Sequence, residues 1–175
     1  PWLPACAAET FFASAVPSGS IEVSLHPTEG IGAGSTRIVT FGVPFPRGSL
    51  TAAQLASVRV LRNGSEVAAY VDQLAPWRHR SNAGIDGQSV RIARIQIEHA
   101  TAATYPNADS LTLEWGGSAR ALNRPVLLDP RASWHTVNSG SFVSADNVQE
   151  PDVYAVLPRA WLAHGVLRGV RTTAF

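Results

Sequence analysis

Lysine and methionine are missing from this chain of 175 residues, and cysteine occurs only once. All 14 basic residues are therefore arginines, and with 13 acidic residues they leave a formal net charge of +1. The arginines are scattered along the chain, which gives neither the basic patch of a nucleic-acid-binding protein nor a polybasic membrane patch. Charged residues make up 15% of the chain, against about a quarter in typical domains. With 14 glycines and 12 prolines, this composition favours short strands and turns over long helices.

A single cysteine excludes an internal disulfide framework. Cys6 remains open to three interpretations: a buried small hydrophobic residue, a free or intermolecularly bonded thiol, or a lipid-modified residue. No segment approaches the roughly 20 apolar residues that span a bilayer, so we expect no membrane insertion. The chain begins Pro-Trp-Leu-Pro without methionine, which we interpret as a trimmed product, for example one whose signal peptide has been removed.

Sites for metals, phosphates and catalytic nucleophiles are not indicated either. The five histidines follow no ligand spacing, and there is no Gly-x-Ser-x-Gly elbow or glycine-rich phosphate loop. Acidic residues are available, but nothing in the sequence pairs them as general acid and base. The sequence therefore predicts no catalytic residue, no metal site and no cofactor in this chain.

What the chain does contain is a series of short runs typical of strands. Alternation or β-forming composition predicts strands over residues 20–26, 37–43, 57–62, 66–71, 89–98, 110–115 and 152–157, with shorter β-like pieces at 125–128 and 133–137. Asn63-Gly64 between two such runs is the strongest signal, because this dipeptide suits the type I′ turn of a hairpin. A bulge near Ala93-Arg94 would reconcile the parity of the isoleucines around it.

Helical signals are brief. Thr51 and Gln54 form a capping-box pattern at a single helical turn over residues 51–55. Residues 158–164 predict a short helix that begins at a proline and ends before Gly165. We therefore predict an all-β barrel or sandwich with one or two short helices, formed by residues 20–175, preceded by an extended N-terminal arm over residues 1–19.

Several of these runs together resemble a known family. They are TFGVPFPRG at 40–48, VRVL at 58–61, EVAA at 66–69, Trp77, DGQSVR at 86–91 and VYAVLPRAWL at 153–162. The set is similar to the N-terminal RIFT-barrel domain of exo-rhamnogalacturonan-lyase-like and YetA-like bacterial proteins. The resemblance implies a RIFT-type β-barrel, or sandwich-like barrel, and an exported, extracellular or cell-surface setting.

The chain also departs from that family. Residues 78–85 are inserted after Trp77, and Ile92 stands where the family has an aromatic residue. Family members continue into a large α/α-barrel domain in which catalysis is expected, so the resemblance implies a fold and not a lyase activity.

Five residues are candidates for contact with a ligand or partner. Trp77 and Trp134 lie at loop edges beside Arg78 and His135, which makes them better surface candidates than Trp115 and Trp161 inside apolar runs. Arg91 belongs to the DGQSVR motif. The predicted ligand- or partner-binding residues are Trp77, Arg78, Arg91, Trp134 and His135.

Two functions fit these observations best. The first is a non-catalytic accessory or interaction module of an exported bacterial protein related to polysaccharide-acting proteins, which packs on another domain through residues 152–175 and binds glycans. The second is a structural subunit of an extracellular filament or phage-like appendage, in which residues 1–19 add a strand to a neighbouring copy. A small stand-alone enzyme ranks third, because it requires distant acids and histidines to converge.

Overall fold

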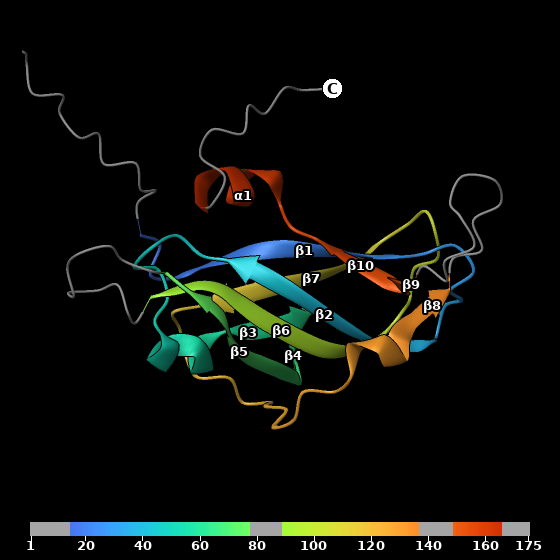
Figure 1. The fold of residues 1–175 in the computed structure, drawn as a ribbon, viewed down its shortest axis with the longest axis horizontal. Helices are drawn as coiled ribbons and strands as arrows, with labels where there is room; N and C mark the ends of the chain where they lie inside the picture. The colour runs from blue at the N-terminus through green and yellow to red at the C-terminus, as the bar shows by residue number, and fades with distance from the viewer. Residues whose placement is uncertain (1–14, 78–88, 137–148, 166–175) are drawn as a thin grey trace, which may run out of the picture.

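The protein is all-β, as the sequence predicts. A computed structural model describes residues 15–77, 89–136 and 149–165 (Figure 1). Its five-stranded sheet has the order β10-β1-β7-β3-β4, its three-stranded sheet has the order β2-β6-β5, and β8 pairs with β9. The strands are β1 (Gly19–Pro27), β2 (Thr36–Pro44), β3 (Arg59–Arg62), β4 (Ser65–Val67), β5 (Ala69–Pro76), β6 (Val90–Ala100), β7 (Asp109–Trp115), β8 (Trp134–Thr136), β9 (Gln149–Pro151) and β10 (Val153–Val156).

Helical structure is limited to short pieces within the described part of the chain. The predicted turn after Thr51 is the 3₁₀ helix η1 (Ala52–Ser57), and the Thr51 backbone N–H donates to Gln54 Oε1 at 3.0 Å. A second 3₁₀ helix, η2 (Pro130–Ser133), precedes β8, and the predicted terminal helix is α1 (Arg159–Gly165). Gly165 is the last residue of α1, whereas the sequence pattern placed it just beyond the helix.

The Asn63-Gly64 hairpin is confirmed. Both residues have positive φ, 50° and 78°, and β3 pairs with β4 across them. The run over residues 66–71, expected to be one strand, is divided at Ala68. Val67 pairs with Val60 in the five-stranded sheet, and Ala69 pairs with Ile97 in the three-stranded sheet. This corner connects the two sheets directly.

The core lies between the two sheets. It is built from alternate residues of β1, β2, β6 and β7, which is the pattern of strands with one face buried. The irregularity predicted near Ala93-Arg94 is present, and it lies on either side of the pair between Ala75 and Ile92. The register of β5 with β6 shifts between Gln73 and Ala75 and again between Ala75 and Pro76. The largest fully buried apolar side chains are Phe45, Leu25, Leu50, Ile95, Ile97, Leu111 and Leu113.

One end of the core is closed by three aromatic rings. Trp115 lies edge-on to Phe45 with centroids 5.3 Å apart, and Trp161 of α1 lies 5.0 Å from Trp115. The Trp115 indole N–H donates to Val16 O, and the Trp161 indole N–H donates to Pro44 O, both at 2.8 Å. The prediction that Trp115 and Trp161 are buried core residues is confirmed.

The segment between β7 and η2 covers the outer face of the three-stranded sheet (Figure 1). Gln96 of β6 is fully buried there: its Nε2 donates to Leu128 O at 2.9 Å, and its Oε1 accepts from Leu128 N–H at 2.7 Å. Nε2 also donates to Thr40 Oγ1 at 2.8 Å. Residues 125–128, expected to be β-like, form no strand, because this backbone bonds to a side chain instead of to a neighbouring strand.

The loop between β6 and β7 is fixed by Asp109. Its carboxylate accepts hydrogen bonds from Ala102 N–H at 2.8 Å and Ala103 N–H at 3.1 Å, and it lies 2.7 Å from the buried His99 Nε2. Burial alone would raise the pKa of Asp109, but the hydrogen bonds from Ala102, His99 and Ala103 together hold that pKa below its ordinary value.

The first residues described continue the predicted arm. Val16 N–H donates to Ser49 Oγ at 2.7 Å, and β1 begins at Gly19, so residues 16–19 contact the sheets directly. Residues 1–14 of the predicted arm, with Cys6, lie outside the described residues, and so do Arg78 and the last part of the predicted interface, residues 166–175.

Candidate binding groove

A groove lies where the two main sheets approach each other, between β2 and β10. These strands are the last strands of their sheets in the described structure. The groove has a volume of about 300 Å³, the lower end of the range usual for ligand pockets. It is lined by Ile38, Thr40, Phe41, Pro130, Trp134, Pro151, Val153, Tyr154 and Ala155.

The hairpin of β8 and β9 supplies one wall of this groove. Trp134 lies opposite Pro151 in the register of the hairpin, and Trp134 is 39% exposed. Ser133, immediately before it, accepts a hydrogen bond from Ile38 N–H of β2 at 2.7 Å, and its carbonyl accepts from Asp152 N–H at 2.9 Å. The hairpin is therefore attached to both strands that border the groove.

Strand β10 also lines the groove through Val153, Tyr154 and Ala155, and Tyr154 is 44% exposed. β10 pairs with β1 through Tyr154 and His26, and Thr28 N–H donates to Asp152 O at 2.9 Å. Since alternate residues of a strand direct their backbone groups to opposite edges, the N–H and C=O groups of Val153 and Ala155 face away from β1, towards the groove.

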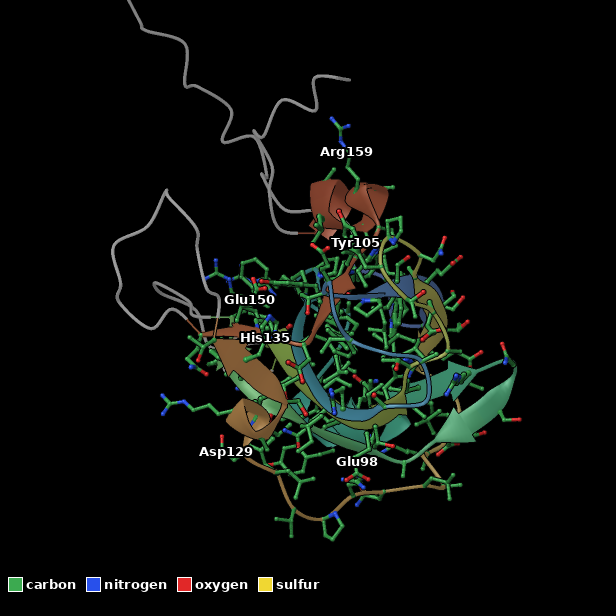
Figure 2. The ribbon with its side chains drawn as sticks, turned by 90° about the vertical axis from the view of Figure 1, so that its right-hand side faces the viewer. Glu98, Tyr105, Asp129, His135, Glu150 and Arg159 are labelled. Carbon is green, nitrogen blue, oxygen red and sulfur yellow. The ribbon has the colours of Figure 1, made fainter. Side chains whose placement is uncertain are left out.

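A chain of polar side chains runs beside the groove. The Tyr154 hydroxyl donates to Glu150 Oε2 at 3.0 Å, and Glu150 Oε1 lies 3.0 Å from His135 Nε2. His135 Nδ1 lies 2.8 Å from Asp152 Oδ1, and Asp152 Oδ2 lies 2.8 Å from Arg37 Nε. Figure 2 shows His135 and Glu150 side by side on the β8–β9 hairpin.

Asp152 occupies the centre of this polar chain. It is buried and receives two positively charged or protonatable partners, Arg37 and His135. Both imidazole nitrogens of His135 face carboxylate oxygens, Nδ1 that of Asp152 and Nε2 that of Glu150. Burial and the hydrogen bond to Glu150 raise the pKa of Tyr154 above its ordinary value, so the phenol stays protonated and acts as a donor.

Two of the five predicted binding residues lie at this site. Trp134 lines the groove, and His135 belongs to the polar chain beside it. The remaining two described candidates, Trp77 and Arg91, are together at another position and do not line the groove. Arg78 lies outside the described residues.

Two hydrogen bonds to the backbone of neighbouring segments fix the position of Trp77. Its indole N–H donates to Phe45 O at 2.9 Å, and its backbone N–H donates to Ser89 O at 2.8 Å. The Arg91 guanidinium carbon lies 5.3 Å from the ring centroid and that of Arg47 lies 5.9 Å from it, within the range of cation–π contacts. Trp77 and Arg91 therefore contact each other, but they form a site separate from Trp134 and His135.

Sequence reasoning did not single out Tyr154, Glu150 or Asp152 as binding residues. The alternation of polar and apolar residues at Asp152, Val153 and Tyr154 predicts a strand with the valine and the tyrosine on opposite faces. This pattern could have identified Tyr154 as a surface residue. The pairing of Asp152 with His135 joins residues 17 positions apart, and no spacing motif relates them.

Among residues 15–77, 89–136 and 149–165, no three His, Cys, Asp or Glu side chains are placed to hold a metal ion. No helix in that same part of the chain is long and apolar enough to cross a membrane. Comparisons of the chain with protein-family models, with curated proteins and with solved structures find no match.

Proposed function

We propose that this chain is a non-catalytic module of an exported bacterial protein, an accessory or interaction domain related to polysaccharide-acting proteins. The observation that carries the proposal is the groove lined by Trp134 and Tyr154, two partly exposed aromatic residues. Exposed aromatic rings beside hydrogen-bonding side chains are suited to ligands that have an apolar face and hydroxyl groups. The RIFT-type resemblance gives the proposal its setting, outside the cell or at its surface.

The arrangement of the sheets supports a flattened barrel of the RIFT type. Consecutive strands β4 and β5 connect the two sheets at one border, across Ala68. At the other border β2 and β10 lie close together on either side of the groove. Two sheets that approach each other at both borders are an intermediate between a sandwich and a barrel.

The experiment is a binding and turnover assay with the full chain on polysaccharides of plant and bacterial cell walls. We expect retention by at least one polysaccharide in affinity electrophoresis, with no new reducing ends and no unsaturated products. Binding should be weakened in Trp134→Ala and unchanged in Tyr105→Ala, which removes an exposed aromatic ring that does not line the groove. Product formation by the wild type that is lost in the groove variant would contradict the non-catalytic assignment.

The second candidate function is a self-assembling structural subunit. Its specific support is β10, the last strand of its sheet, which carries the exposed apolar side chains Tyr154 and Val156. Light scattering on a size-exclusion column tests it, with the full chain and a chain lacking residues 1–14, which keeps the hydrogen bonds of Val16 intact. Large assemblies of the full chain alone would favour this candidate, and monomers in both cases would exclude it.

A further inference from the structure

The residues that line the groove indicate whether its ligand is charged or neutral. None of the nine lining residues is charged. Among them are two prolines and three aromatic side chains, Phe41, Trp134 and Tyr154, which offer apolar surface to the C–H face of a sugar ring. A charged ligand group in such a groove would lose its hydration without gaining a partner of opposite charge, which is strongly unfavourable.

The ionisable groups nearest to the groove also disfavour a charged ligand. The basic side chains beside the groove, Arg37 and His135, already contact the carboxylates of Asp152 and Glu150. The carboxylate of Glu150 accepts from the hydroxyl of Tyr154, a residue that lines the groove. A carboxylate on the ligand near Tyr154 would therefore meet a like charge close by, which disfavours uronic acids.

Two residues that line the groove carry hydroxyl groups, Thr40 and Tyr154, and these present complementary hydrogen-bonding groups. Gln96 is fixed in orientation because its oxygen accepts from Leu128 N–H, so its Nε2 must donate to Thr40 Oγ1. The Thr40 hydroxyl hydrogen is thereby left to donate. The Tyr154 hydroxyl donates to Glu150, which leaves its oxygen to accept. A hydroxyl group of a ligand is both acceptor and donor, and it matches this pair.

We propose that the groove between β2 and β10 binds an uncharged saccharide ring, stacked on Trp134, with its hydroxyl groups bonded to Thr40 and Tyr154. This inference rests on the proposed carbohydrate-related function and names the ligand class of the same site. The groove should therefore prefer neutral glycan segments to polyuronates, although the family resemblance points to proteins that act on uronate-containing polymers.

The test uses matched pairs of oligosaccharides that differ only in charge. Oligogalacturonate, rhamnogalacturonan and oligomannuronate are each compared with the same material after chemical reduction of its carboxyl groups to alcohols. Calorimetric titration of the full chain should give binding at least about ten-fold tighter for a reduced form than for its acidic parent, with little dependence on salt.

Variants locate the binding. Trp134→Ala should weaken binding of the neutral form by roughly ten-fold, the effect of losing one aromatic stacking partner. Thr40→Val, which keeps the shape but removes the donor, should weaken it by about five-fold. Tyr105→Ala is the matched control and should leave binding unchanged, and thermal melting of each variant establishes that it is folded.

The outcomes separate this inference from the proposed function. Equal or tighter binding of the acidic forms, lost in Trp134→Ala, would overturn the inference and leave the proposed function standing. Neutral binding with an affinity unchanged in Trp134→Ala would also overturn the inference, because the ligand would lie elsewhere. Binding of none of the glycans, or binding of a proline-rich peptide in their place, would overturn both.

Discussion

The burial of Gln96 leads to a quantitative prediction for stability. The side chain is 0% exposed and makes three hydrogen bonds, two of which copy the pattern of a neighbouring strand by pairing with both the N–H and the C=O of Leu128. Gln96→Leu keeps the volume of the side chain and removes all three bonds. It therefore isolates the polar contribution from the packing contribution.

The expected cost follows from the groups left behind. Each hydrogen bond contributes roughly 0.5–1.5 kcal/mol net, and a buried polar group without a partner costs about 1–3 kcal/mol. Leu128 is only partly buried, so its backbone can regain water if the segment lifts from the sheet. We therefore expect a loss of about 2–4 kcal/mol in the free energy of unfolding, below the sum of the individual penalties. Thr40→Val removes only one of the three bonds and should cost about 1 kcal/mol.

Urea unfolding measures the difference. With a slope of about 2 kcal/mol/M, the midpoint of Gln96→Leu should fall by about 1–2 M. Amide hydrogen exchange should show that Leu128 loses protection while residues of β7 keep it. A midpoint within about 0.25 M of wild type, together with unchanged protection of Leu128, would refute the view that this amide holds the segment in place.

Two further predictions concern a backbone turn and a carboxylate. Gly116 has φ of 78° and an added Cβ would lie 2.2 Å from Pro17 O, whereas Gly64 has the same φ and open space around it. Gly116→Ala should thus cost clearly more than Gly64→Ala, for which about 1 kcal/mol is expected, and equal costs in urea unfolding would show that the contact with Pro17 is unimportant. Because the pKa of Asp109 is lowered in the folded state, its contribution is fully present above the unfolded pKa of about 3.9 and is lost as pH falls through the lower folded value. Asp109→Asn should be less stable at neutral pH and lose less stability below about pH 4, and a pH profile of unfolding parallel to wild type would contradict this assignment.

Local chemistry made the hairpin and the aromatic core predictable. Asn63 and Gly64 adopt positive φ in any tight hairpin, so the dipeptide identifies the turn without knowledge of the remaining fold. Trp115 and Trp161 lie in apolar runs, and such runs pack into the core. In each case the residues beside the turn or the tryptophan are enough for the prediction, although the contacts of the two tryptophans join distant segments.

Pairing between distant segments explains what the sequence did not predict. The run over residues 66–71 reads as one strand, yet Val67 and Ala69 belong to different sheets because their partners, Val60 and Ile97, lie in different sheets. In the groove, Trp134 was identified from its place at a loop edge. Tyr154 was not identified, because its role depends on β10 lying opposite η2 and β8 across the groove.

Trp115 connects the first described residues of the chain with the helix α1. Its indole N–H holds Val16 at the beginning of the described chain, and its face packs on Trp161 in the terminal helix. In β1, Gly19 pairs with Trp115 at one end of the strand, whereas His26 pairs with the groove residue Tyr154 near the other end. The strands β8 and β9 lie on the side away from α1 (Figure 1). The two ends of the described chain, near Val16 and at α1, therefore lie at one end of the strands and the groove lies at the other, a geometry that suits a domain inserted into, or presented by, a longer polypeptide.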